Sequence, residues 1–249
     1  MKNVFIGIGE GPTPDKEIIK TKTGEFFQPI RLYYRVKSMT GIRVAFNKLR
    51  CIDYEPDDDH WVWVYENEAR KINFEINYAA LHSDDKPLIL GIFSYISDEY
   101  ICLDVGSIER ALKAIEFFDR HIKKYVAKIE FVASYNKLPK NRSEYPGIRY
   151  DKLFCDVDIH NIEHQIDEKL IEIDRARESG GLAELVKKFE FNLVETFIVE
   201  CEQESLSFLS MSLRMRQALA MARRRGDTKT GLFDIIQSFA KFMAKKTAH

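Results

Sequence analysis

The stretch CDVDIHNIEH, from Cys155 to His164, is where this chain of 249 residues changes its pattern of apolar residues. Before it, apolar residues occur in short runs, several of them with the two-residue period of β-strands. After it, they recur at the three- and four-residue spacing of helices over long segments. The sequence therefore predicts a β-rich domain, 1–157, followed by a helical domain, 158–249, with the Pro- and Gly-containing segment 136–147 as the best linker.

The first half predicts a mostly antiparallel sheet. Between residues 26 and 36, apolar residues alternate with polar ones such as Arg31 and Arg35, which indicates a strand with one solvent-exposed face. Short polar turns separate further candidate strands, and the acidic turn 55–59 marks the clearest hairpin. We expect strands at 3–8, 26–36, 44–54, 60–65, 72–76, 87–96, 99–105, 125–135 and 148–154.

One amphipathic helix is predicted among these strands. Ser107 is a suitable N-cap, and apolar residues follow it at helical spacing from Ile108 to Ile122. The order of strand, helix and strand over 99–135 is typical of a crossover connection. Together with the antiparallel strands, this pattern predicts an α+β fold.

The second half predicts helices. The first begins at Asp158, a natural N-cap, and ends at Gly180. The buried face of this helix is expected to contain Ile159, Ile162, Ile166, Leu170 and Ile173. The others are expected at 182–201, 205–225 and 232–246. Within 182–201, Phe189, Phe191 and Leu193 also alternate, which leaves a strand open as the alternative.

The composition is that of a globular protein in a reducing compartment. Apolar residues make up 45% and aromatic residues 12%, enough for a packed core and against a disordered chain. The four cysteines are scattered without a C-x-x-C pair. No apolar run is long enough for a signal peptide or a transmembrane helix, so we expect a cytoplasmic protein. The glycines at 7, 9 and 11 precede Pro12 and Pro14, which prevents the helix start of a dinucleotide-binding loop.

The central stretch also concentrates potential metal ligands. His160-x-x-Glu163-His164 matches the H-x-x-E-H pattern of inverted zinc peptidases, in which two histidines on one helix hold Zn²⁺ and the glutamate polarises a water. Asp156, Asp158 or Cys155 could supply further ligands. This interpretation predicts a metal-dependent hydrolase with His160, His164 and Asp156 on zinc and Glu163 as the catalytic base.

A simpler interpretation explains the same residues. Asp158 caps the helix, Asp156 and Glu163 complement the positive end of its dipole, and the histidines lie on one flank. A five-residue pattern with three specified positions is weak by itself, so the metal site is the less favoured of the two.

The end of the chain is basic. From Ser205 onward nine Lys and Arg stand against two acids, a formal charge of +7, whereas the whole chain carries −1. Such an asymmetry is typical of a region that meets nucleic acid or an acidic partner, or that matches an acidic part of its own chain. The candidate contact residues are Arg214, Arg216, Arg223, Arg224, Arg225 and Lys229.

These observations favour a non-enzymatic interaction module that binds nucleic acid or an acidic protein through its C-terminal helices, with the hydrolase as the alternative. A protein partner or a homo-oligomer is expected, because the last helix is strongly amphipathic. We predict that Phe233, Ile236, Phe239 and Met243 are buried, against the chain's own helices or across a dimer contact. Another protein or a membrane surface are the remaining alternatives for this face.

Overall fold

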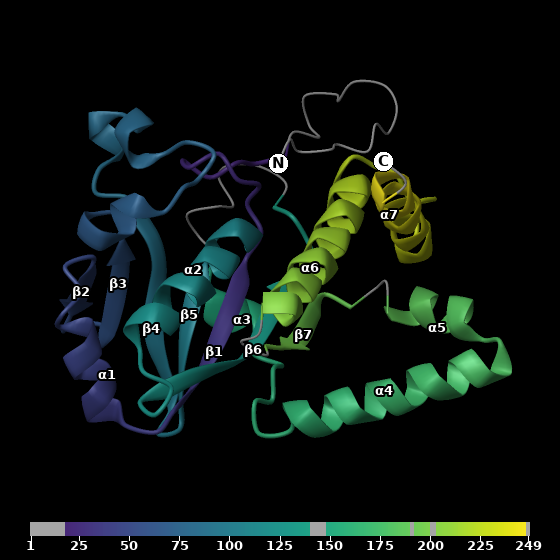
Figure 1. Ribbon diagram of the computed structural model, residues 1–249, viewed down its shortest axis with the longest axis horizontal. Helices are drawn as coiled ribbons and strands as arrows, with labels where there is room; N and C mark the ends of the chain where they lie inside the picture. Colours follow the sequence, from purple (N-terminus) through teal and green to yellow (C-terminus); the bar gives the residue numbers. More distant parts are fainter. Residues whose placement is uncertain (1–17, 140–147, 190–191, 200–202, 248–249) are drawn as a thin grey trace.

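The computed structural model describes residues 18–139, 148–189, 192–199 and 203–247. In these ranges the chain forms one antiparallel sheet with the strand order β2-β3-β4-β5-β1-β6-β7, followed by helices (Figure 1). The strands are β1 (Ile30–Val36), β2 (Ile52–Glu55), β3 (His60–Val64), β4 (Ile89–Ser97), β5 (Tyr100–Val105), β6 (Ala127–Tyr135) and β7 (Val194–Ile198). The helices are α1 (Met39–Phe46), α2 (Ile108–His121), α3 (Tyr150–Leu153), α4 (Ile162–Ser179), α5 (Leu182–Phe189), α6 (Gln203–Arg224) and α7 (Leu232–Thr247), with the 3₁₀ helices η2 (Asn67–Lys71), η3 (Tyr78–Ala80) and η4 (Ser83–Asp85). The predicted α+β class is confirmed.

The centre of the sheet is built around β1. Both β5 and β6 pair with it antiparallel, one on each side, and α2 crosses the sheet to connect them. The predicted order of strand, helix and strand is therefore confirmed. Ser107 caps α2 as expected, since its Oγ accepts a hydrogen bond of 3.0 Å from the backbone N of Arg110. The hairpin of β2 and β3 is confirmed too, with Glu55 opposite His60.

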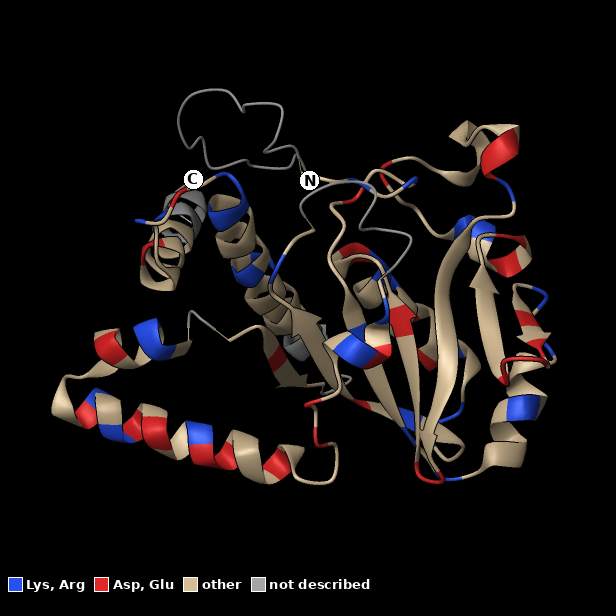
Figure 2. Cartoon of the chain, turned by 180° about the vertical axis from the view of Figure 1, so that it is seen from behind, with Lys and Arg blue, Asp and Glu red and all other residues tan. Residues whose placement is uncertain are grey.

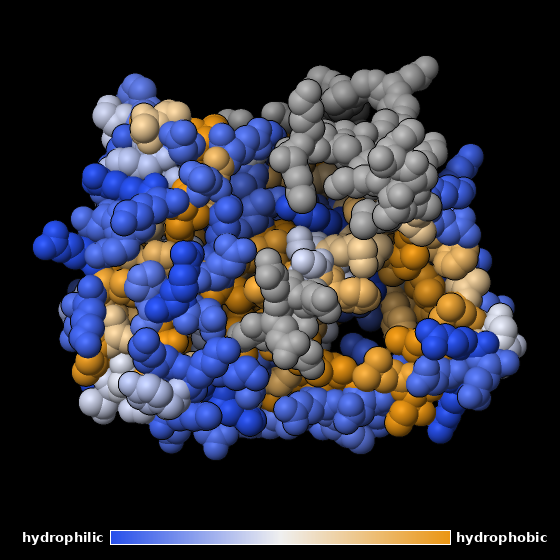
Figure 3. Space-filling view, in the orientation of Figure 1, coloured by the Kyte–Doolittle hydropathy of each residue, from blue (hydrophilic) through white to orange (hydrophobic). Residues whose placement is uncertain are grey.

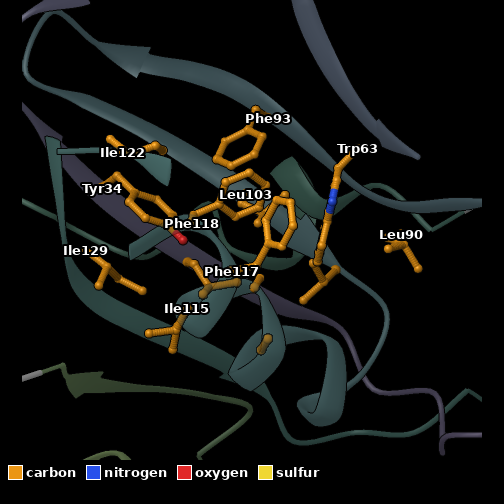
Figure 4. Packing of buried hydrophobic residues seen from close by; sticks show 14 of the residues in the cluster. Tyr34, Trp63, Leu90, Phe93, Leu103, Ile115, Phe117, Phe118, Ile122 and Ile129 are labelled. Atoms are coloured by element: carbon orange, nitrogen blue, oxygen red, sulfur yellow. The ribbon is translucent and has the colours of Figure 1, made fainter. Parts of the chain in front are cut away.

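The main core lies between the sheet and α2 (Figure 4). Phe118 on α2 packs edge to face on Phe93 of β4, with ring centroids 4.9 Å apart, and on Trp63 of β3, at 5.1 Å. Phe46 of α1 closes the same cluster at 4.8 Å from Phe93. Aromatic side chains from two helices and two strands thus hold this face of the sheet.

The other face carries a second, smaller core beneath α3 and the start of α4. It consists of Tyr33, Tyr100, Cys102, Phe131, Ala133, Phe154, Ile159 and Ile162. The expectation that β1 has one solvent-exposed face is wrong here, because Arg31 and Tyr33 are both buried. The helical segment that covers them comes from more than a hundred residues further along the chain, so the local alternation in β1 does not reveal it.

Three predicted strands differ in the structure. The start of the expected strand 44–54 belongs to α1, because Ser38 accepts a hydrogen bond of 3.0 Å from Gly41 N and Ile42 and Phe46 bury one helical face. Residues 72–76 form no strand, although Ile72 and Phe74 are buried as the apolar pattern indicates. The segment 148–154 contains the short helix α3 instead of a strand.

The segment 182–201 splits into α5 and β7, so the prediction of one long helix is wrong. The strand begins at Val194, after the alternating Phe189–Leu193 on which the strand alternative rested, and Phe189 itself ends α5. β7 joins the sheet beside β6, with Phe197 opposite Val132. A strand from the C-terminal half therefore completes the sheet of the N-terminal half. The predicted strand 3–8, the glycines that follow it and most of the linker lie outside the described residues.

The C-terminal helices attach to the sheet through α6, whose Leu209 and Leu213 belong to the main core. α7 packs on α6 and α5 through Leu232 and Ile235, which are buried with Leu219. The predicted ends of α6 and α7 are close to those observed, and Gly226 takes the left-handed conformation, φ +86°, after α6. No helix in the described ranges combines the length and apolar character needed to cross a membrane.

The predicted burial of the α7 face is correct only in part. Ile236 and Phe239 are half-buried against the cluster of Leu219, Leu232 and Ile235, but Phe233 is 37% exposed, so its predicted burial is wrong. The side chain of Met243 lies outside the described residues. The helix thus docks through a narrower stripe than its wide apolar face indicates.

Candidate functional site

The predicted metal ligands do not come together. His160 precedes α4, which begins at Ile162, so the two histidines do not lie one turn apart on a helix as the H-x-x-E-H pattern requires. His164 lies on α4 with its Nε2 3.4 Å from Glu168 Oε1, and both side chains are exposed. Among the described residues, no group of three or more His, Cys, Asp and Glu side chains is placed to hold a metal ion.

The two histidines are not on one helix because α4 starts later than predicted. Asp158 does not cap α4; its Oδ1 accepts a hydrogen bond of 3.2 Å from His160 N, and its carbonyl accepts one of 3.1 Å from Asn161 N. These bonds form a turn that delays the helix by one turn relative to the prediction. Asp156 and Cys155 are exposed in the same segment, with Sγ 3.5 Å from Asp156 Oδ1. The segment therefore brings Cys155 and Asp156 together but adds no third ligand to them. Glu163 does not lie between two histidines of one helix, as the zinc interpretation requires.

A polar network that the sequence analysis missed joins the three central strands beside His160. The Tyr100 hydroxyl donates to Glu130 Oε2 at 2.9 Å and accepts from Arg35 Nε at 3.0 Å. Burial and the bond to Glu130 raise the pKa of Tyr100. The His160 ring stands edge-on to the Tyr100 ring, 6.2 Å between centroids. The Tyr100 hydroxyl thus donates one hydrogen bond and accepts another. This arrangement is better suited to linking the three strands than to transferring a proton.

Arg31 forms a second network further along β1. Its side chain is 4% exposed and makes hydrogen bonds of 2.7 and 2.8 Å to the two carboxylate oxygens of Asp104, and one of 2.8 Å to Asp151. The ring of Phe154 lies 5.4 Å from its guanidinium carbon. Burial opposes the charge of Arg31, but these bonds outweigh it and raise its pKa. The network attaches α3 to the sheet, so it explains why a charged residue lies inside the second core.

Two of the predicted contact residues on α6 are engaged inside the chain. Arg216 is buried and forms an ion pair with Glu195 of β7, including a bond of 2.5 Å from Nη2 to Oε1. Arg214 Nη1 lies 3.6 Å from Glu109 Oε1 on α2. The alternative that the basic tail matches acids of the same chain is therefore correct for these two residues, and burial removes Arg216 from any contact surface.

The remaining four lie together at the C-terminal end of α6 and in the turn after it (Figure 2). Arg224 Nε donates to the carbonyl of Pro139 at 3.2 Å, which brings the segment after β6 to the same place. Lys137 in that segment is exposed, as are Arg225 and Lys229. Comparison of the chain with protein-family models, curated proteins and solved structures finds no match.

Proposed function

We propose that this chain is a binding module that docks an anionic macromolecule, a nucleic acid or an acidic protein, on the end of α6. The surface consists of Lys137, Arg223, Arg224, Arg225 and Lys229, and we call it the basic end. Such a cluster attracts phosphates or carboxylates by charge, and the attraction is strongest at low salt.

The basic end is held in a defined geometry. The carboxylate of Asp227 accepts hydrogen bonds of 2.9 Å from Lys229 N, 3.0 Å from Thr230 N and 2.6 Å from Thr230 Oγ1. These bonds lower the pKa of Asp227, with the Thr230 side chain as the largest contribution. They form a tight turn that keeps Lys229 near the end of α6. The cations are thereby presented from a folded scaffold, which reduces the entropy cost of binding.

The observation that carries the proposal is that the cluster draws on more than one segment. Cations at a helix C-terminus stabilise the helix dipole, and this alone accounts for Arg223, Arg224 and Arg225. It does not account for Lys137, which follows β6, or for Lys229, which lies beyond the helix. A surface assembled from separate segments favours recognition of a ligand over stabilisation of one helix.

The test is a titration of the full chain against fluorescent duplex DNA, single-stranded RNA and polyglutamate, followed by anisotropy at several salt concentrations. The triple variant Arg223→Ala, Arg225→Ala, Lys229→Ala should bind more weakly. On duplex DNA, the slope of log affinity against log salt should become shallower by about 0.9 for each phosphate that the variant no longer neutralises.

The matched control removes three other exposed lysines, Lys123→Ala, Lys124→Ala and Lys128→Ala, which lie around the turn between α2 and β6. The control variant has the same net charge as the triple variant. If both lowered the affinity equally, the total charge of the chain would explain binding, and the proposal that the basic end is the binding surface would be refuted. Binding to DNA or RNA identifies a nucleic-acid partner, and binding to polyglutamate only identifies an acidic protein. No binding to any of the three ligands at low salt would overturn the proposal.

A further inference from the structure

The outer side of β7 is an open sheet edge in the described chain. The strand order ends at β7, and no described strand pairs with it on the side away from β6. Ile198 is 46% exposed, and the other four residues of the strand are half-buried. An open edge presents unpaired N–H and C=O groups, so it is a template for another strand.

The register with β6 shows which backbone groups point outward. Asn136 N donates to Leu193 O at 2.7 Å, and Val199 N donates to Glu130 O at 2.8 Å. In an antiparallel pair, every second residue makes such bonds, so the odd-numbered residues of β7 bond toward β6. The backbone groups of Val194, Thr196 and Ile198 therefore point to the open edge.

These three residues make the edge self-complementary. Antiparallel pairing of two copies about Thr196 sets Thr196 opposite Thr196, and Val194 opposite Ile198 twice. All three pairs are of the hydrogen-bonded kind, which gives about six new backbone hydrogen bonds. β-branched side chains opposite one another are favourable cross-strand pairs.

Charge distinguishes this edge from the other one. The one charged residue of β7, Glu195, is paired with Arg216 of its own chain. The opposite edge strand, β2, contains Asp53 and Glu55 and leads into the acidic turn 57–59. Two copies of β2 would bring several acids together, as protected edges do. Two copies of β7 would bring only Glu195 diagonally beside its own copy, and each Glu195 is paired with Arg216 of its own chain.

We propose that β7 pairs with β7 of a second copy of this chain, antiparallel about Thr196, so that two sheets become one continuous sheet. The arrangement has a two-fold axis through the Thr196 pair, and every residue pair away from the axis occurs twice. α4 extends past β7 in Figure 1, on the side where the second sheet would lie. Its Leu170, whose predicted burial is wrong, is 54% exposed, and Ile171 is 51% exposed. Both offer apolar surface to that sheet. Figure 3 shows apolar surface around the hollow between α4 and α6.

The first test is the oligomeric state, measured by sedimentation velocity over a range of concentrations. The wild-type chain of 29.1 kDa should form a dimer. Thr196→Pro removes an outward N–H without removing a bond to β6, and Thr196→Lys places two cations opposite each other. Both should raise the dissociation constant at least about tenfold, which corresponds to ~1.4 kcal/mol.

Two controls accompany these variants. Thr196→Ala keeps the N–H and should remain a dimer, and Tyr54→Lys, on the exposed β2 edge, should also leave the dimer unchanged. Circular dichroism checks that each variant is folded. A wild-type chain that stays monomeric at all concentrations, or a dimer that only Tyr54→Lys dissociates, would overturn the proposal.

A cross-link tests the register independently of stability. Cα atoms in a hydrogen-bonded antiparallel pair are about 5.5 Å apart, within the range that a disulfide spans. Thr196→Cys, in a chain with Cys155→Ser and Cys201→Ser, should therefore form a disulfide-linked dimer under mild oxidation. Tyr54→Cys in the same background should not. A dimer that forms no link through residue 196 would contradict this register.

Discussion

At the scale of single residues, Arg216 and Glu195 connect the C-terminal helices to the sheet. Their side chains are 9% and 15% exposed, so water solvates neither charge well and each charge is stabilised mainly by the other. Arg216 Nη1 also donates to the carbonyl of Phe189 at 3.3 Å, which holds the end of α5. One arginine thereby joins α5, β7 and α6. Removal of one charge of a buried pair leaves the other unpaired in a poorly solvated site.

We predict that Arg216→Met lowers the free energy of unfolding by about 3 kcal/mol, because it leaves the carboxylate of Glu195 without its partner. The double variant Arg216→Met, Glu195→Leu should recover most of that stability. Urea unfolding followed by circular dichroism measures both. Arg225→Ala, an exposed arginine on the turn after α6, serves as the control and should change stability by less than about 0.5 kcal/mol. Equal effects of the Arg216 and Arg225 changes would contradict the structural role of the pair.

At the scale of the element, α7 shows how one amphipathic helix divides its apolar residues between core and surface. Ile235 is buried in the cluster with Leu219 and Leu232, whereas its near neighbour Phe233 is 37% exposed. The two residues lie on different sides of the helix, because positions two apart point about 200° from each other. Only the side toward α5 and α6 contributes to packing.

This division predicts unequal effects of two truncations. Ile235→Ala should lower the free energy of unfolding by about 2–4 kcal/mol, since it opens a cavity in a buried cluster. Phe233→Ala should lower it by less than about 1 kcal/mol although it removes the larger side chain. Thermal and urea unfolding of both variants provide the measurement. If Phe233→Ala proved the more damaging change, Phe233 would have to be covered, for example by a partner.

At the scale of the whole molecule, the two faces of the sheet share their strands. Cys51 lies in the main core and Cys102 in the second core, and both are fully buried. Burial raises the pKa of Cys51 to about 12 and raises that of Cys102 as well. Because the reactive form is the thiolate, neither should react with an alkylating agent at neutral pH in the folded protein. Cys155 is exposed and provides the contrast.

We therefore predict that iodoacetamide labels Cys155 in the native protein, and that Cys51 and Cys102 become reactive together as urea increases. The common midpoint is expected because β5 contributes side chains to both cores. Pulse alkylation followed by mass spectrometry of the peptides gives each midpoint. Separate midpoints for Cys51 and Cys102 would show that the two faces unfold independently.

Local patterns were sufficient for the elements that carry their own start and stop signals. Ser107 and the stripe after it identify α2, the acidic turn identifies the hairpin of β2 and β3, and Gly180 and Gly226 end α4 and α6. These signals act within a few residues, through a cap, a turn or a left-handed backbone conformation. The sequence by itself therefore determined the α+β class and most of the helices.

Tertiary contacts decided most of the rest. The segment 194–198 is a strand because β6 supplies backbone partners and Arg216 neutralises Glu195, and neither contact is near in sequence. The burial of Arg31 could not be predicted for the same reason. The acids that pair with its charge, Asp104 and Asp151, are also distant in the sequence. A local effect separated His160 from His164, since the turn held by Asp158 moved the helix start by one turn. A pattern of residue types reports local preference, whereas the placement of charged side chains depends on which distant segments pack beside them.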